Sequence, residues 1–466
     1  MPGLSPTATP APLGPRDRAR AAAAPVTASG CGTLPPDRGR PRSPDIEQLV
    51  LERVLKRLCR DGYARFSVSA IAGELGISKP TIYLRWPSKA ALARAALAIP
   101  GKYHPIVVVP SGSPSADLVA YLGQLHRTFA ATGVGLTGGL WAAEAQNPEL
   151  TRSYRRHFVF PTRQSLRAIL EAAVVAGELP VTANLNAAVH MLAGALYAAY
   201  IADEQGELDI PAMVGITLRG LAGGSAVGGA AHGAAPRPLH MGGVVGVEMG
   251  DAVSGEEAPR PRVSATSSPV GRTDQPRPAP GRPRSDIGSQ VLKVVLGRLA
   301  RDGYLRMSVS AIAAEVRVSK PSIYLRWPSK AALATAAVAT LRQRIPTPDW
   351  LSGDMPADLL RYMVTLRGYF VAMGLGLSGA LWSEEHENPA LIGTYREEVV
   401  RPSREILRAI LEQGRSQGRF AEALALTPAV HLLAGAVYGA CIAAEEPLLD
   451  LPAIVETVLG GLSTQN

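Results

Sequence analysis

The side chains best suited to chemistry form a mixed group of hydroxyl, aromatic and cationic residues in one short segment. Lys79, Thr81, Tyr83 and Arg85 alternate along a stretch that is predicted to be helical. Such groups can hydrogen-bond to base edges and phosphates in the major groove of duplex DNA. Lys89 stands at the expected start of the next helix, where a helix N-terminus and a lysine together favour a phosphate. These residues predict a nucleic-acid-binding surface.

The segment 67–92 has the spacing of a helix-turn-helix, which would position those side chains. Ala72 is small where two helices cross, and Gly76 supplies the positive φ that a tight turn requires. Ile82 anchors the second helix on the core, with its polar neighbours outward. Helix N-caps are predicted at Ser67, Ser78 and Ser88. The pattern alone also fits an ordinary helical hairpin whose polar side is merely solvated.

The chain contains this arrangement twice. Residues 45–221 and 286–462 align without a gap at an offset of 241 residues, and 34 of the 48 positions in 45–92 are identical in 286–333. The outward residues recur as Lys320, Ser322, Tyr324 and Arg326, followed by Lys330. A unit of this length is too long for a solenoid repeat and indicates whole-domain duplication. The repetition of the outward face favours a functional surface over a solvated one.

Composition and charge restrict the class of protein. The 466 residues are 47% hydrophobic and 19% charged, which is enough apolar material for several folded domains. The net charge of +9 is uneven: 45–92 carries +3 and 286–333 carries +5, whereas 93–221 is neutral and 334–466 carries −5. This separation predicts that each basic segment is a head that binds a polyanion, and that each larger neutral or acidic segment is a body with a different role.

Several other classes are disfavoured. The three cysteines are far apart, no run of 18 apolar residues occurs, and the N-terminus lacks a signal pattern. We therefore expect a cytoplasmic protein with no membrane span. No metal-ligand cluster, phosphate-binding loop or nucleophile elbow is found, so the sequence predicts no enzyme, no metal and no cofactor.

A basic arm precedes each predicted head, as RGRPR at 38–42 and GRPR at 281–284. Arg40, Arg42, Arg282 and Arg284 could enter a narrow minor groove, although a soluble basic linker is the alternative. The remaining pattern predicts helices only, with breaks at Pro161 and Pro402, and hence an all-α fold. The expected domains are a tail at 1–37, heads at 38–92 and 281–333, bodies at 93–221 and 334–466, and a linker at 222–280.

The runs SVSAIAGELGISKPTIYLRWPSKAAL and SVSAIAAEVRVSKPSIYLRWPSKAAL resemble the N-terminal signature of TetR-family bacterial transcription regulators. The segment 141–179 resembles the ligand-binding and dimerisation body of that family. The resemblance implies two-fold pairing on a near-palindromic operator and a small-molecule effector. Carried over by position, it implies DNA contacts at Ser78, Lys79, Thr81, Tyr83, Arg85, Lys89, Ser319, Lys320, Ser322, Tyr324, Arg326 and Lys330.

The bodies offer weaker candidates, because a polar residue on an apolar helix is more often a core or surface residue than a ligand contact. The candidate effector contacts are His126, Trp141, Glu144, Tyr154, Arg367, Trp382, Glu385 and Tyr395. The apolar stretches 187–202 and 428–443, with Ala-Gly pairs, suit either dimer faces or internal core helices. The turn glycine Gly76 is replaced by Arg317 in the second unit, which predicts strain there.

These observations favour a ligand-responsive DNA-binding regulator, most simply a repressor, with its two units paired within one chain. A pair of chains is the alternative assembly. A protein that sequesters a ligand or another regulator without binding DNA is the alternative function.

Overall fold

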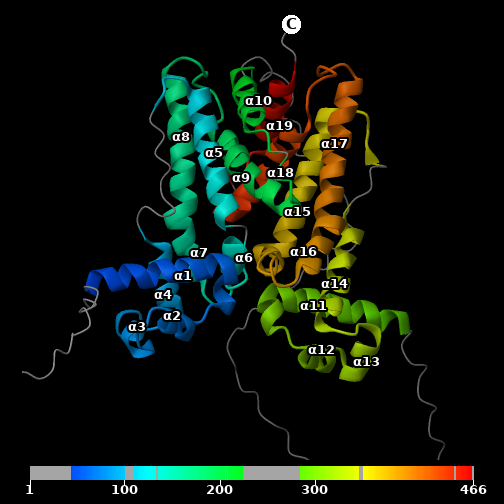
Figure 1. Cartoon of the computed structure of the whole chain (residues 1–466). Helices are drawn as coiled ribbons and strands as arrows, with labels where there is room; N and C mark the ends of the chain where they lie inside the picture. Colours follow the sequence, from blue (N-terminus) through cyan, green and yellow to red (C-terminus); the bar gives the residue numbers. More distant parts are fainter. Residues whose placement is uncertain are drawn as a thin grey trace, which may run out of the picture. The chain divides into compact units, whose positions relative to one another are not determined.

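The computed structural model describes residues 43–99, 110–132, 135–204, 206, 208–223, 284–345, 350–444 and 448–463. Contacts within the chain divide it into residues 1–46 and a compact unit over 47–466. All regular elements in the described ranges are helices, and one isolated bridge joins Phe420 to Ser463. The predicted all-α fold is therefore confirmed (Figure 1). The predicted tail, almost all of the linker, and Arg40, Arg42 and Arg282 lie outside the described residues.

The first head is built from four helices, three of which begin at serine caps. They are α1 (Ser43–Arg65), α2 (Val68–Glu74), α3 (Lys79–Arg85) and α4 (Lys89–Leu97). The three predicted caps are confirmed, because the hydroxyls of Ser67, Ser78 and Ser88 accept hydrogen bonds from backbone N–H groups three residues later. Ile82 is 1% exposed and anchors α3 on the core. The cap spacing thus fixes where the helix-turn-helix begins and ends.

The second head repeats the first, with one strained position. Its helices are α11 (Arg284–Arg306), α12 (Val309–Val316), α13 (Lys320–Arg326) and α14 (Lys330–Ala339). Gly76 has φ +64° and Arg317 has φ +58°, so the second turn keeps the left-handed conformation without its glycine. A side chain in this conformation costs about 1–2 kcal/mol. The predicted strain at Arg317 is present.

The helices of the two bodies follow the heads in parallel order. The first body comprises α5 (Pro114–Thr132), α6 (Gly135–Trp141), α7 (Pro148–Tyr154), the π-helix η1 (Arg155–Val159), α8 (Phe160–Val175), α9 (Leu185–Ala202) and α10 (Ile210–Gly223). The second comprises the 3₁₀-helix η3 (Thr340–Arg344), α15 (Met355–Trp382), α16 (Pro389–Tyr395), the π-helix η5 (Arg396–Val400), α17 (Arg401–Ser416), α18 (Thr427–Ala443) and α19 (Leu451–Leu462).

The predicted proline breaks take the form of π-helical turns. Pro161 lies in the first turn of α8 and Pro402 in the first turn of α17, each directly after a π-helix of five residues. Proline has no N–H to donate to the preceding turn, so the helix locally widens there. Each proline therefore splits the long predicted helix as expected.

Helices of the two repeats cross at very short distance. A Cβ atom built on Gly194 of α9 would lie 1.7 Å from the carbonyl oxygen of Gly435 on α18. One built on Gly435 would lie 2.3 Å from the backbone nitrogen of Ala195. Helices α10 and α19 cross in the same way, at Gly220 and Gly461. Only glycine fits at these crossings, and they hold the two bodies together in this structure.

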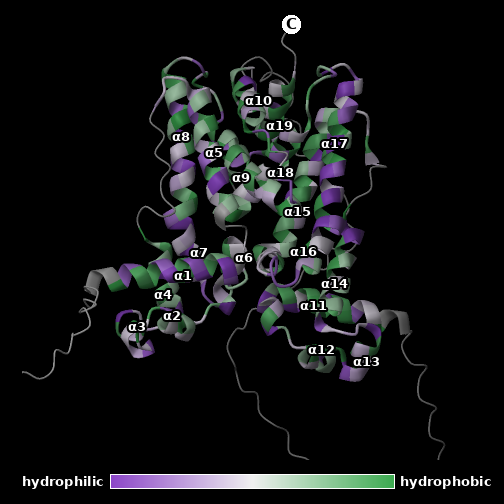
Figure 2. Ribbon diagram, viewed as in Figure 1, coloured by the Kyte–Doolittle hydropathy of each residue, from purple (hydrophilic) through white to green (hydrophobic). Residues whose placement is uncertain are grey.

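The helices that make these contacts are strongly apolar (Figure 2). Helices α9 and α15 are long and apolar enough to span a membrane by length and composition alone. However, 83% and 56% of their respective apolar windows are buried inside the fold. Their apolar character is thus largely accounted for by core packing.

A second crossing between the repeats lies at the ends of α6 and α15. A Cβ atom on Gly138 would lie 2.6 Å from Cβ of Trp382, and one on Gly379 would lie 2.7 Å from Cβ of Trp141. The two tryptophan rings meet edge to face, with centroids 5.4 Å apart and planes at 67°. Because α6 also packs on α1 through Gly139, this crossing connects the bodies to the first head.

Candidate functional site

The exposed side of α3, the second helix of the helix-turn-helix, carries a residue that was not predicted from the sequence. Successive residues of an α-helix are about 100° apart, so Pro80 and Leu84 lie nearly opposite the buried Ile82. Leu84 is 86% exposed, and Leu325 at the same place in α13 is 89% exposed. The positions of these two leucines on the helical wheel could have revealed their exposure, but the prediction considered only the polar side chains of the helix. An apolar side chain here suits the methyl group of thymine.

The hydroxyl and aromatic groups of α3 flank this apolar tip. The Nζ atom of Lys79 lies 5.7 Å from the ring centroid of Tyr83. The hydroxyls of Ser78 and Thr81 are hydrogen-bonded at 2.7 Å. The second head repeats both contacts, at 5.8 and 2.7 Å, with Lys320, Tyr324, Ser319 and Ser322. The structure brings these predicted residues together on one helix in each head.

The side chain of Arg85, also on α3, contacts α1 of the same head. Arg85 forms an ion pair with Glu47 of α1. In the second head, where Gly288 replaces that glutamate, Nη1 of Arg326 lies 2.8 Å from where a Cβ of Gly288 would be. Both arginines therefore lie against the first helix of their heads, and DNA contact by them stays a prediction.

Lys89 is half-buried and holds the start of α4 against the end of α1. Its Nζ donates to the carbonyl oxygen of Ala64 at 3.0 Å and lies 5.0 and 4.5 Å from the ring centroids of Tyr63 and Phe66. Burial lowers the pKa of its ammonium group. Lys330 makes the corresponding contacts. Both lysines have a structural role here, and their contact with phosphate stays a prediction.

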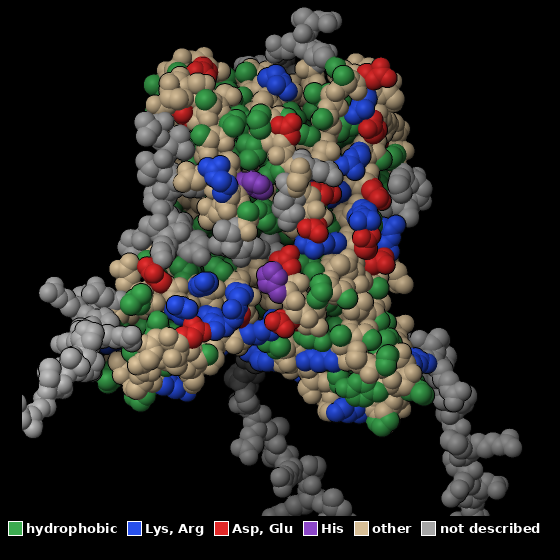
Figure 3. All heavy atoms as spheres, in the orientation of Figure 1, with side chains coloured by type: hydrophobic (Ala, Val, Ile, Leu, Met, Phe, Trp, Pro, Cys, Tyr) green, Lys and Arg blue, Asp and Glu red, His purple; other side chains and the backbone are tan. Residues whose placement is uncertain are grey.

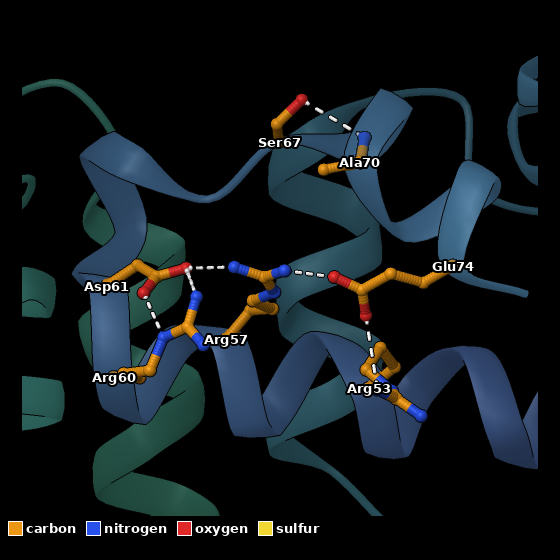
Figure 4. A network of polar contacts seen from close by, with 7 residues as sticks. All are labelled: Arg53, Arg57, Arg60, Asp61, Ser67, Ala70 and Glu74. Atoms are coloured by element: carbon orange, nitrogen blue, oxygen red, sulfur yellow. Dashed lines mark hydrogen bonds and ion pairs between the residues drawn. The ribbon is translucent and has the colours of Figure 1, made fainter.

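Other cations of the head form an internal clamp between α1 and α2 (Figure 4). Arg57 pairs with Asp61 at 3.0 Å and with Glu74, while Arg53 reaches Glu74 at 3.2 Å. The hydrogen bond from Arg57 lowers the pKa of Glu74. Arg298 makes the equivalent pairs in the second head. This clamp fixes the two helices that support α3 and α13.

Lysine and arginine side chains gather on the heads in the space-filling view (Figure 3). Apart from this clamp, the exposed cations of the described α3 and α13 are Lys79, Arg85, Lys320 and Arg326. The residues of the predicted arms lie outside the described residues, as does the side chain of Arg284. The basic heads nevertheless provide the charge that a nucleic acid requires.

Each body contains a narrow pocket at the same place in the repeat. The first is lined by Leu125, Phe129, Phe158, Val159, Thr162, Arg163, Ala193, Tyr197, Gly439 and Ile442. The second is lined by Leu366, Tyr369, Phe370, Val399, Val400, Ser403, Arg404, Leu407, Ala434 and Tyr438. The enclosed space in each pocket is about 10 Å³, close to that of a single water molecule. Apolar walls with a few polar groups are typical of small-molecule sites.

The predicted effector residues do not line these pockets. Trp141 and Trp382 contact each other between the repeats, and both are 1% exposed. Glu144 pairs with Arg155 at 3.1 Å, and the equivalent pair Glu385–Arg396 repeats this at 3.1 Å. Of the others, His126 lies beside the Tyr200 ring, Arg367 is half-buried, and Tyr154 and Tyr395 are buried behind the pockets. Their role as effector contacts stays a prediction.

The heads are also tied to the opposite bodies. Arg65, at the end of α1, pairs with the buried carboxylate of Glu384 at 2.6 Å and donates to the carbonyl oxygen of Ser383. The equivalent Arg306 meets the neutral Gln146 at 2.5 Å. A charged contact therefore holds the first head and a neutral one the second, so the two heads are not equivalent.

The comparisons with known proteins agree with this architecture. A family model described as "Bacterial regulatory proteins, tetR family" matches residues 57–96 and 298–337. A model described as "Tetracyclin repressor-like, C-terminal domain" matches residues 108–213 and 348–458. Both models thus occur twice, once in each repeat.

Individual relatives each correspond to one repeat. An uncharacterised HTH-type transcriptional regulator of Mycobacterium tuberculosis is 31% identical over 190 residues, which are 39% of this chain and 91% of that protein. A DNA-binding transcriptional repressor TetR of Mycobacteroides abscessus is 36% identical over 129 residues, 28% of this chain and 68% of that protein. An uncharacterised regulator of Bacillus subtilis is 26% identical over 160 residues, 34% of this chain and 80% of that protein. The chain belongs to the TetR family of DNA-binding transcriptional regulators, with the family unit present twice in tandem.

Proposed function

We propose that the chain is a ligand-responsive repressor that binds a near-palindromic operator as a single-chain pseudodimer. In this proposal each repeat acts as one protomer, with heads at 38–92 and 281–333 and bodies at 93–221 and 334–466. It acts in the cytoplasm and without catalysis. The basic arms at Arg40, Arg42, Arg282 and Arg284 would add minor-groove contacts.

The observation that carries the proposal is the crossing of α9 and α18 at Gly194 and Gly435. The backbones approach so closely there that any Cβ atom would clash with the opposite helix. The polar contacts that join the repeats, such as Arg65 with Glu384 and Arg404 with Glu204 at 2.9 Å, support the same pairing. Together these contacts support a pairing of the two repeats as protomers.

The linker is long enough for this arrangement. A random coil of the length of the proposed linker, about 60 residues, would span roughly 40–46 Å, comparable with the ~34–36 Å between two half-sites one DNA turn apart. Tethering gives an effective concentration on the order of millimolar. Pairing within the chain is therefore favoured over pairing between chains at the concentrations of a cell.

Effector response would follow from the same assembly. A molecule that binds one arrangement of the bodies better than another shifts the population of head spacings, and DNA is released. The apolar pockets in the bodies are the support for this part of the proposal.

A random-sequence duplex selection with the full chain tests DNA recognition. We expect an operator with two related half-sites, and binding that falls steeply between two salt concentrations. Replacing Lys79 and Tyr83 by alanine should remove recognition of one half-site, and replacing Lys320 and Tyr324 should remove recognition of the other. A chain that enriches no sequence and does not bind duplex DNA would contradict the proposal and favour a sequestering protein.

A further inference from the structure

The first helix of each head bends shortly before an arginine that contacts the other repeat. Gly62 of α1 and Gly303 of α11 both have φ +71° and ψ 167°, and Arg65 and Arg306 are the last residues of these helices. A Cβ atom built on Gly139 of α6 would lie 3.1 Å from Cα of Gly62, so the bend in α1 packs against the body of its own repeat. Each arginine beyond the bend thus joins the head of one repeat to the body of the other.

Arg65 is held at two points by the end of α15. Its Nη2 atom lies 2.6 Å from Oε1 of Glu384, and its Nη1 atom donates to the carbonyl oxygen of Ser383 at 2.9 Å. Ser383 and Glu384 are the two residues after Trp382, where α15 ends. Glu384 is 1% exposed, and its second oxygen accepts a hydrogen bond from Asn388. Because the guanidinium group is planar and makes two contacts, this arrangement restrains both the distance and the orientation of the first head.

The corresponding contact of the second head is neutral and exposed. Arg306 donates to Oε1 of Gln146, and Nε2 of Gln146 donates to the carbonyl oxygen of Arg301 at 2.8 Å. Arg306 and Gln146 are both exposed. Ala143 stands where the second body has Glu384, so the first body provides no carboxylate at that position. Because water competes for an exposed neutral hydrogen bond, this contact restrains its head less than the buried ion pair does.

The ion pair of Arg65 and Glu384 lies close to the second head as well as the first. Burial and the Glu384 carboxylate raise the pKa of Tyr304 on α11, and the Arg65 guanidinium opposes this rise. Burial lowers the pKa of Lys330 at the start of α14, and the same carboxylate opposes that fall. The pair therefore lies where the two heads come near each other, and it restrains the position of one head relative to the other.

The placement of the heads matters because their recognition helices are almost the same. Helix α3 has the sequence KPTIYLR and α13 has KPSIYLR, so the two heads should read closely similar half-sites. Each base pair inserted between two half-sites moves one of them by about 3.4 Å and rotates it by about 35° around the DNA axis. Two heads that are held firmly match only a narrow range of such placements. The contacts between each head and the opposite body therefore determine which operators fit.

We propose that Glu384 is a positioning residue for operator binding. Through Arg65 it holds the first head against the second body, and it thereby sets the spacing and relative orientation at which both heads meet the DNA. The neutral contact between Arg306 and Gln146 leaves the second head more mobile. This inference rests on the proposed binding to an operator with two half-sites and names the contact that selects their spacing.

Binding to a series of operators tests this role. Fluorescence anisotropy measures the affinity of the full chain for its selected operator and for versions whose half-sites are one or two base pairs closer together or farther apart. We expect the parent to lose about tenfold or more in affinity for a shift of one base pair, because firmly held heads force the DNA to deform. Glu384→Gln removes the charge at nearly the same volume and should reduce this loss to about threefold or less.

Two further variants separate positioning from a general loss of stability. Arg65→Lys keeps the charge but cannot make both contacts as a planar fork, so it should flatten the spacing profile in the same direction. Glu397→Gln is the matched control, because Glu397 pairs with Arg401 on the surface of the second body at 2.8 Å and should keep the parent profile. A merely structural defect would weaken binding to every operator alike. The same spacing profile in the parent and in Glu384→Gln would overturn the inference.

Hydrogen exchange of the full chain without DNA tests the restraint separately. The backbone N–H groups of residues 63–68 should be better protected than those of 304–309 in the parent, because the buried ion pair holds the first head. This difference should disappear in Glu384→Gln and persist in Glu397→Gln. Equal protection of the two segments in the parent, or a difference that Glu384→Gln leaves unchanged, would overturn the inference. A chain that keeps the difference but binds no duplex DNA would contradict the proposed function and, with it, the role of Glu384 in DNA binding.

Discussion

Replacing Gly435 by alanine tests how closely the two repeats are joined. Its Cβ atom would lie 2.3 Å from the nitrogen and 2.6 Å from the Cα atom of Ala195, and neither backbone atom can move without shifting α9. Overpacking of this kind costs about 1–3 kcal/mol, against which alanine gains about 0.5–1 kcal/mol over glycine within a helix. The net loss, up to about 2.5 kcal/mol, should lower the unfolding midpoint by about 1–3 °C, since 1 kcal/mol is worth only about 1 °C in a unit of this size.

Gly393→Ala is the matched control for this substitution. Gly393 also lies within a helix, α16, but a Cβ atom there meets nothing within 4 Å. The alanine should therefore raise the midpoint slightly, because it gains helix propensity without a clash. Scanning calorimetry of the two variants beside the parent chain measures the difference. If Gly435→Ala were as stable as Gly393→Ala, the close approach of α9 and α18 would be refuted.

Three further predictions concern the heads and the buried histidines. Arg317→Gly relieves a residue at φ +58° and should raise stability by about 1 kcal/mol in thermal unfolding, so an unchanged or lower midpoint would count against strain there. Leu84→Ala should weaken operator binding, and replacing one thymine by deoxyuridine should weaken the parent but not the variant; equal losses in both would exclude contact with a thymine methyl. Burial lowers the pKa of His190 and His431 to about 3, below their unfolded value near 6.5, so stability should fall as the pH drops from about 6.5 towards 3. The slope, at most about 1.4 kcal/mol per pH unit for each histidine, should flatten between pH 6.5 and 5 in the His190→Gln, His431→Gln double variant.

The local structure of the heads could be predicted because it depends on short-range rules. Serine caps, the left-handed turn at Gly76 and the breaks at Pro161 and Pro402 each follow from one or two residues and their immediate neighbours. Because the second unit repeats the sequence of the first, the same caps, turn and proline break could be predicted in both units. These parts of the sequence interpretation are confirmed.

The candidate site was only partly predictable. Arg85 was expected to point outward, but its pairing with Glu47 depends on how α1 crosses α3. Leu84 was overlooked because only the polar side chains of this helix were considered, although the predicted anchor Ile82 already placed Leu84 on the opposite, exposed side. Trp141 was assigned to a pocket, while its contact with Trp382 arises from a crossing of two repeats 241 residues apart.

The mass of the chain in solution, alone and on its operator, tests the central claim most directly. Light scattering coupled to size exclusion distinguishes one 48.9 kDa chain from two. The account predicts a single chain in both states, with both half-sites of one operator protected by it. A stable particle of two chains carrying four heads would contradict it.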